Sequence, residues 1–304
     1  MALLDRAIVR VLPAVPKPVV KRLSSRYIAG DQLSNACRIV KALNDKGKLA
    51  TVDVLGEEIT TEEEAIALVA EYEHVLEAIQ REGLDSNVSV KLTGFGLKLG
   101  RDFCRGNLAR LVRAAATRGN FVRIDMEDSS TTSDTLAIYR ELRAEGLDNV
   151  GIVLQSYMKR TLTDIVELAD LKPNVRVCKG IYVEPPEVAY QDFETVRINF
   201  AEAVAALLDN GSYVGIATHD EWVIAESLTL LEERELHPHQ YEFQMLLGVR
   251  SHLGDELVRE GHRLRIYVPY GRQWYEYCLR RLQENPKIAG YVAADTFRRL
   301  ARRR

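Results

Sequence analysis

The chain has 304 residues, of which 46% are apolar and 28% are charged, and its formal net charge is -3. A chain of this length can bury a large core, and alternating strands and helices can use about 250 residues or more in one domain. The charge balance excludes an overall positive field, so nucleic acid is not an expected partner.

The first 45 residues are expected to form a helical extension before the first strand. Asp5, Arg6 and Arg10 interrupt their apolar start and three prolines follow, so the segment lacks the continuous apolar run of a secretion signal or membrane span. The four cysteines are far apart, which favours reduced thiols over a metal site or disulfides. We therefore predict a cytoplasmic protein with an extension over residues 1–45 and one catalytic domain over residues 46–304.

Eight short runs rich in β-branched residues are predicted to be strands. They are residues 50–55, 88–93, 121–127, 150–156, 175–180, 213–219, 241–246 and 264–271. The segments between them carry apolar residues at three- and four-residue spacing, which indicates amphipathic helices. Because parallel strands must be covered on both faces, near-continuous apolar strands alternating with helices predict a closed α/β barrel of the (β/α)8 type. An open doubly wound sheet is the alternative.

Polar and ionisable side chains lie near the carboxyl ends of these predicted strands, where barrels place their active sites. They are Glu57, Lys91, Asp125, Glu127, Gln155, Arg176, Lys179, His219, Gln244 and Tyr270. Each alone is compatible with a structural salt bridge inside a barrel layer. Together they indicate an active site, because buried charges are costly unless they are paired or used.

A further helix is predicted around the sequence YCLRRLQENP at residues 277–286. Positions three and four apart share a helix face, so Tyr277, Arg280, Arg281 and Glu284 form one strip. Two guanidinium groups there can hold an anion with paired, charge-assisted hydrogen bonds. No P-loop, Rossmann fingerprint or GxSxG elbow occurs, and HPH at residues 237–239 favours a surface turn over a zinc site.

The strand-end segments and this last helix resemble the proline dehydrogenase family, in the same order along the chain. The matching segments are SVKLT, RIDMED, VRVCKGIY, ATHD, YEFQMLLG, YVPYG and YCLRRLQENP. The resemblance implies a distorted barrel with the last helix over its mouth. It also implies an FAD enzyme that oxidises L-proline to Δ1-pyrroline-5-carboxylate by hydride transfer from C5 to flavin N5.

The resemblance also assigns roles in substrate binding. Arg280 and Arg281 clamp the carboxylate of proline, with help from Lys91. Asp125 pairs with Arg280 and orients it, and Glu57 pairs with Arg280 as a gate at the site entrance. A pocket with this excess of cations disfavours the ammonium form of proline, and the sequence assigns no dedicated base.

Other positions are implied to contact the apolar ring of proline or the flavin. Tyr182 and Tyr277 pack against the ring of proline. The residues that match flavin contacts are Gln155, Arg176, Lys179 and His219. A positive charge near the flavin stabilises its reduced form. Asp220 is a departure, because the family often has asparagine there.

The family passes its electrons to a membrane quinone, so we expect transient contact at the inner face of the membrane. The basic residues 298–304 are the candidate for this contact. Two alternative functions stay open at this point. One is a barrel that binds proline or flavin without turnover, and the other is an aldolase- or phosphate-binding barrel that uses Lys91 or Lys179 as a Schiff base.

Overall fold

The computed structural model describes residues 26–56, 59–271 and 273–274. Its strands are β1 (Leu49–Val54), β2 (Ser86–Lys91), β3 (Val122–Asp125), β4 (Val150–Gln155), β5 (Asn174–Cys178), β6 (Tyr213–Ala217), β7 (Tyr241–Leu246) and β8 (Leu264–Tyr270). They form one closed barrel in chain order, and every neighbouring pair is parallel, including β8 with β1. The predicted (β/α)8 barrel is confirmed, and the open sheet is excluded.

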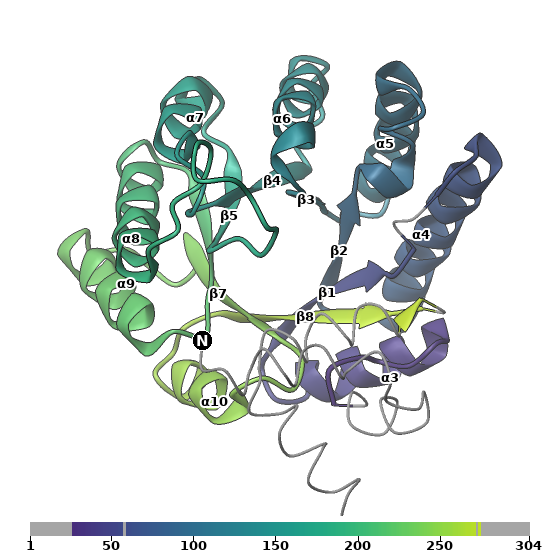
Figure 1. The fold of residues 1–304 in the computed structure, drawn as a ribbon. Helices are drawn as coiled ribbons and strands as arrows, with labels where there is room; N and C mark the ends of the chain where they lie inside the picture. The colour runs from purple at the N-terminus through teal and green to yellow at the C-terminus, as the bar shows by residue number, and fades with distance from the viewer. Residues whose placement is uncertain (1–25, 57–58, 272, 275–304) are drawn as a thin grey trace, which may run out of the picture.

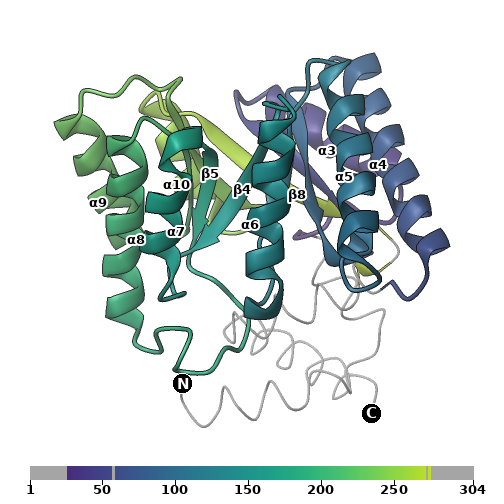
Figure 2. The ribbon, with the colours of Figure 1, turned by 90° about the horizontal axis from the view of Figure 1, so that it is seen from above.

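Helices follow the strands and surround the barrel, as Figure 1 shows. They are α4 (Glu62–Glu82), α5 (Arg101–Ala116), α6 (Ser129–Ala144), α7 (Thr161–Leu168), α8 (Phe193–Asp209), α9 (Glu221–Glu233) and α10 (Ser251–Arg259), with short 3-10 helices η2 (Thr93–Phe95) and η3 (Ala169–Leu171). In the side view of Figure 2, α5, α6, α8 and α9 stand roughly parallel to one another. The predicted helix around residues 277–286, and its place over the barrel mouth, lie outside the described residues.

Helix α3 (Leu33–Asn44) precedes the barrel and packs against β8 and β1. Ala36, Cys37 and Val40 recur at helical spacing and are buried. In Figure 1, α3 lies between α10 and α4 and completes the outer ring. In a regular barrel a helix after the last strand would cover this position. The division into residues 1–45 and 46–304 stays a prediction, although α3 shares the core of the barrel.

Side-chain caps fix where several helices begin. Thr61 and Glu64 form a reciprocal capping box at the start of α4, which follows β1. Asp128, Asp192 and Asp220 cap α6, α8 and α9 by accepting a hydrogen bond from a backbone N–H of the first turn. Two of these caps, Asp128 and Asp220, lie close behind the carboxyl ends of β3 and β6, so they also fix the rim of the barrel.

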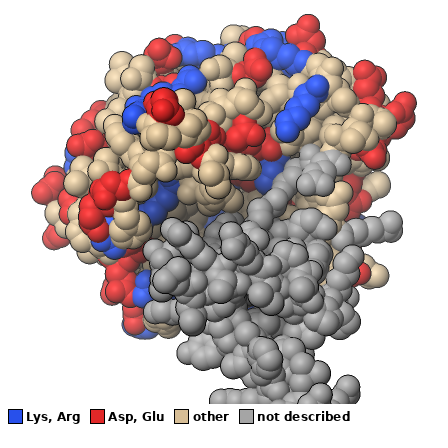
Figure 3. All heavy atoms as spheres, in the orientation of Figure 1, with Lys and Arg blue, Asp and Glu red and all other residues tan. Residues whose placement is uncertain are grey.

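The outer surface mixes charges of both signs. On the face shown in Figure 3, lysine and arginine side chains alternate with aspartate and glutamate. Within the described part of the chain, no helix combines the length and the apolar character that crossing a bilayer requires.

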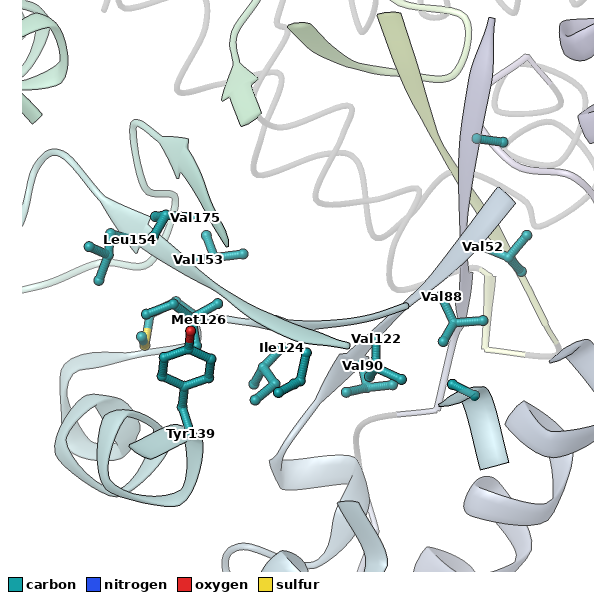
Figure 4. Close-up of a cluster of buried hydrophobic side chains, with 14 of the residues drawn as sticks. Val52, Val88, Val90, Val122, Ile124, Met126, Tyr139, Val153, Leu154 and Val175 are labelled. Carbon is teal, nitrogen blue, oxygen red and sulfur yellow. The ribbon is translucent and has the colours of Figure 1, made fainter. Parts of the chain in front are cut away.

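The apolar core lies between the strands and the helices. Alternate strand residues such as Val88, Val90, Val122 and Ile124 are fully buried there. Figure 4 shows these side chains in one layer with Tyr139 of α6. The intervening positions point into the barrel, where many are polar, so the barrel interior is a network of charges and hydrogen bonds.

Candidate active site at the carboxyl end of the barrel

Asp125, the last residue of β3, joins four strands at the carboxyl end of the barrel. Its Oδ1 accepts hydrogen bonds from Ser89 Oγ of β2 at 2.6 Å and from Arg176 Nη1 of β5 at 2.6 Å. Its Oδ2 accepts one from the Tyr267 hydroxyl of β8 at 3.0 Å. Because β3 neighbours neither β5 nor β8, the hydrogen bonds from Arg176 and Tyr267 cross the barrel interior. The predicted site residues Asp125 and Arg176 therefore lie together.

Lys91, at the end of β2, lies beside Asp125 and is held by a second carboxylate. Its Nζ is 3.2 Å from both carboxylate oxygens of Asp53 and 3.9 Å from Asp125 Oδ2. Asp53 is only 1% exposed, and the Tyr72 hydroxyl of α4 also donates to it at 3.2 Å. Burial, reinforced by the charge of Asp53, raises the pKa of Tyr72, so its hydroxyl stays a donor. Sequence analysis missed Asp53.

Arg176 is oriented by a chain of hydrogen bonds from β7. Its Nε donates to Gln244 Oε1 at 2.5 Å, and Gln244 Nε2 donates to Glu242 Oε1 at 2.6 Å. The Tyr267 ring centroid lies 5.4 Å from the guanidinium carbon of Arg176. Arg176 is 6% exposed, and its buried Nη2 has no hydrogen-bond partner among the described residues. A buried donor without a partner is unfavourable, so this atom indicates a missing acceptor.

Gln155, at the end of β4, has a buried acceptor atom without a partner among the described residues, whereas Arg176 has a buried donor. Its Nε2 donates to the carbonyl oxygens of Met126 at 3.1 Å and Glu127 at 3.3 Å. These bonds fix the amide, and they leave Oε1 buried and without a partner within the described part of the chain. The strand ends thus present one buried donor and one buried acceptor that are suited to a polar ligand.

Asp220 binds two cations next to these strand ends. Its carboxylate accepts hydrogen bonds from Lys179 Nζ at 2.5 Å and from Arg197 at 2.8 and 2.9 Å. Burial acts to raise the pKa of Asp220, but the hydrogen bonds from Arg197 and Lys179 outweigh it and hold this pKa well below its usual range. Both cations also lie over the ring of Phe193, with Lys179 Nζ 4.2 Å and Arg197 Cζ 4.3 Å from its centroid. Sequence analysis left Asp220 out of the site.

His219 and Tyr182 lie on neighbouring loops after β6 and β5. His219 Nε2 accepts a hydrogen bond from the backbone N–H of Leu246 at 3.0 Å, so the neutral ring carries its proton on Nδ1. Tyr182 is half-buried. Glu184 fixes its loop by accepting hydrogen bonds from the Ser129 backbone N–H and hydroxyl, both at 2.6 Å. The loop after β5 is therefore attached to the start of α6.

Two polar strand-end residues have structural roles. Glu127 accepts hydrogen bonds from the backbone N–H and the hydroxyl of Thr93, at 3.0 and 2.5 Å, and so supports the loop after β2. The Tyr270 hydroxyl donates to Glu71 of α4 at 2.7 Å, outside the barrel. The predicted site residues that lie outside the described residues are Glu57, Tyr277, Arg280 and Arg281. In the described ranges no three histidine, cysteine or acidic side chains gather as a metal site would require.

A closed parallel barrel whose carboxyl end gathers buried charges and unpaired polar atoms has the architecture of a (β/α)8-barrel enzyme. The family model for proline dehydrogenase matches residues 36–294. Proline dehydrogenase 1 of Bacillus subtilis (strain 168) is 39% identical over 267 residues, which cover 88% of each chain. Proline dehydrogenase of Deinococcus radiodurans is 36% identical over 294 residues, covering 93% of this chain and 95% of the relative. The chain belongs to the proline dehydrogenase family, whose members are oxidoreductases.

The barrel also resembles part of a longer protein of known structure. Proline utilization A (PutA) from Bdellovibrio bacteriovorus, inactivated by N-propargylglycine, superposes with a TM-score of 0.83 over 91% of this chain and 36% of that chain. The two sequences are 22% identical over this region. At this level of identity the likeness supports the barrel fold alone.

Proposed function

We propose that the chain oxidises L-proline to Δ1-pyrroline-5-carboxylate with FAD as its cofactor, as the first step of proline catabolism. Family membership supports the reaction. The observation that carries the cofactor assignment is a pair of buried atoms without partners among the described residues: Arg176 Nη2, from the middle of β5, and Gln155 Oε1, from the end of β4. A flavin ring presents both hydrogen-bond acceptors and an N–H donor, which are the two kinds of partner that these atoms lack.

Other described residues suit the same cofactor. Arg176 would place positive charge near the flavin, which stabilises the reduced form, and Lys179 would add a second cation held in place by Asp220. His219 lies on the loop after β6, and the Leu246 backbone N–H holds its ring through Nε2. Bound FAD would accept the hydride that leaves C5 of proline.

The described charges around the substrate position sum to zero. Lys91 and Arg176 contribute two positive charges, and Asp53 and Asp125 contribute two negative ones. Each of these cations has a nitrogen within 4.0 Å of a carboxylate oxygen of Asp53 or Asp125. A neutral cluster would not favour an anionic carboxylate or disfavour the ammonium form of proline. The proposal therefore depends on the predicted clamp, which lies outside the described residues and would supply the excess positive charge. Lys91 would assist this clamp, and Asp125 would orient it.

The Schiff-base alternative is disfavoured by the contacts of both candidate lysines. Lys91 Nζ is shared between the two oxygens of Asp53, and Lys179 Nζ is 2.5 Å from Asp220. A Schiff-base lysine must reach a substrate carbonyl as a free amine. Both ammonium groups are instead held by carboxylates.

The decisive experiment is the absorbance spectrum of the purified protein before and after anaerobic addition of L-proline. We expect flavin bands that bleach with proline. Arg281→Met should raise the KM for proline by about two orders of magnitude and leave the flavin bound, because it removes a charged hydrogen-bond donor to the carboxylate. Arg259→Met, at an exposed position of α10, is the matched control. A colourless protein that cannot be reconstituted with FAD would contradict the proposal.

We further propose that the electrons pass to a membrane quinone and that residues 298–304 provide contact with anionic lipid. Clustered arginines near a surface attract anionic head groups, at about 1 kcal/mol per residue. Deleting residues 298–304 should reduce co-sedimentation with vesicles that contain anionic lipid and leave activity with a soluble dye acceptor intact. Equal sedimentation of both forms would remove this assignment.

A further inference from the structure

A cavity of about 490 Å³ lies at the amino end of the barrel, opposite the candidate active site. Residues at or just before the starts of several strands line it, including Leu49, Ser86, Asn174 and Tyr213. The ends of α4 and α5 and the loops after them close one side. In barrel enzymes this face ordinarily serves stability, so a polar cavity there is not part of the catalytic site. We call it the amino-end cavity.

Arg123 of β3 is the deepest charged group of this cavity. It is 2% exposed. Its guanidinium donates only to neutral oxygens: the carbonyls of Ile152 and Asn174, at 2.8 and 2.6 Å, and the side-chain oxygen of Asn174. Its Nε has no partner among the described residues, and no carboxylate there pairs with it. A buried arginine that donates to no carboxylate is unusual, because burial of a charge is costly unless it is closely paired.

The rest of the lining adds positive charge. Arg118, Arg263 and Arg265 also line the cavity, and its carboxylates are Asp85 and Glu242. Four guanidinium groups and two carboxylates leave a formal excess of two positive charges. Glu242 already has a cationic partner, since Arg265 donates two hydrogen bonds to its carboxylate at 2.7 and 3.0 Å. Asp85 is exposed at the rim.

Two further lining atoms are buried without partners in the described part of the chain. Arg118 Nε is a donor, and Asn87 Oδ1 belongs to a side chain that is 9% exposed. Arg118 also contacts Glu77 at 3.3 Å on the outer side of the helices. Burial and the nearby charge of Arg176 lower the pKa of Arg123 to about 9, and the opposing charges of Glu242 and Asp125 offset only part of this shift. The lining of the cavity therefore carries more positive than negative groups.

We infer that the amino-end cavity binds a small oxyanion of the phosphate class, either inorganic phosphate or the phosphate group of a small ester. Guanidinium groups match the oxygens of a phosphate in fixed, paired geometry. A dianion balances the formal excess of two positive charges among the lining residues. The site is separate from the flavin, because it lies at the starts of the strands instead of their ends.

Isothermal titration of the flavin-loaded protein with inorganic phosphate tests this inference, because bound FAD fills its own phosphate subsites. Titrations at constant ionic strength, with chloride as the reference anion, separate binding from salt screening. We expect saturable binding of one phosphate per chain. A parallel titration with glycerol 3-phosphate separates the two sources: tighter binding of the ester identifies it as the ligand class, and tighter binding of inorganic phosphate identifies the free anion.

Matched variants make the test specific. Arg118→Gln combined with Arg263→Gln should weaken phosphate binding about tenfold or more, because two cations of the lining are lost. Arg259→Gln, an exposed arginine outside the cavity, should leave affinity unchanged. Asp85→Asn should tighten binding, since it removes a carboxylate whose side chain is exposed at the rim. The inference would be overturned if phosphate did not bind saturably. It would also be overturned if the affinity were the same in the Arg118→Gln/Arg263→Gln and Asp85→Asn variants as in the parent.

Discussion

Asp220 shows how one residue can position cations near a proposed cofactor site. It caps α9 and accepts hydrogen bonds from Lys179 and Arg197. Asparagine at this position could keep the cap but could not neutralise two cations. The acid in this chain would therefore reduce the positive charge that Lys179 presents to the proposed flavin.

Replacement of this acid gives a pH-dependent stability difference. The pKa of Asp220 lies below its ordinary value of 3.8, so its stabilising contribution is present above that value and is lost as pH falls further. Asp220→Asn should lower the free energy of unfolding by about 1–3 kcal/mol at neutral pH, because three charge-assisted hydrogen bonds from two cations weaken or are lost. Urea unfolding at pH 7 and near pH 3 measures this. A difference that stays constant with pH would contradict the ion-pair role.

The same substitution should also change the reduction potential of the bound flavin. Removing a negative charge beside Lys179 leaves that cation less compensated, which favours the more negative, reduced form of the cofactor. We expect the reduction potential of bound FAD to rise in Asp220→Asn, as measured by equilibration with a reference dye. Asp134→Asn, at the surface of α6, is the control and should leave the potential unchanged.

Asp125 is the residue on which the barrel-end network depends. It pairs with Arg176 at 2.6 Å and accepts bonds from Ser89 and Tyr267. Asp125→Ala would leave the buried Arg176 without its carboxylate, which costs about 3–5 kcal/mol for a buried pair. We expect a large loss of stability in urea unfolding, together with weaker retention of FAD. Stability within about 1 kcal/mol of the parent would show that Arg176 has another counterion.

Strand-end positions of the site could be predicted from sequence, but the pairs between them could not. Lys91, Asp125 and Arg176 were identified because polar residues at the ends of β-branched runs are unusual. Their contacts join residues far apart along the chain: Asp125 lies 51 positions from Arg176 and 142 from Tyr267. Only closure of the barrel brings such residues together. Asp53 was missed because a single acid inside an apolar strand resembles a structural ion pair.

The inner face of the strands is more polar than the sequence pattern indicated. Near-continuous apolar strands were expected, because both faces of a parallel sheet are covered. In β3 and β5, however, Arg123, Asp125 and Arg176 alternate with apolar residues. Successive side chains of a strand point to opposite faces, so polar residues that alternate with apolar ones indicate a polar barrel interior and an apolar outer face. The sequences VRID of β3 and VRVC of β5 show this alternation. The strands themselves were predictable to within two residues at every end, because β-branched residues fill many of their outward positions.

The connection from β5 towards α8 needs glycine at its first turn. Gly180 has a φ of 100°, and a Cβ there would overlap the ring of Tyr157. Gly180→Ala should therefore cost about 1–3 kcal/mol more than the backbone strain alone and should disturb the adjacent Lys179. Gly146→Ala is the matched control, since Gly146 has a φ of 79° with no atom near the new Cβ. Thermal unfolding and FAD retention of both variants test this, and equal effects would exclude a role for the close approach to Tyr157.

At the scale of the molecule, the outer ring of helices is closed by an element that precedes the barrel. The carboxyl end holds the proposed redox site, and the amino end holds the positively charged cavity. The connected bonds from Glu242 through Gln244 to Arg176 run between them inside the barrel. Helix α3 supplies the part of the outer ring that packs against β8 and β1.

If α3 is integral to the barrel, its buried face should contribute to the stability of the whole domain. Val40 is fully buried against this core, whereas Lys41 on the same helix is exposed. Val40→Ala should lower the free energy of unfolding by about 1–3 kcal/mol in one cooperative urea transition, because it removes buried methyl groups. Lys41→Ala should change it by less than about 0.5 kcal/mol. If Val40→Ala instead produced a separate early transition with an unchanged main one, residues 1–45 would be an independent extension, and α3 would not be part of the barrel's folding unit.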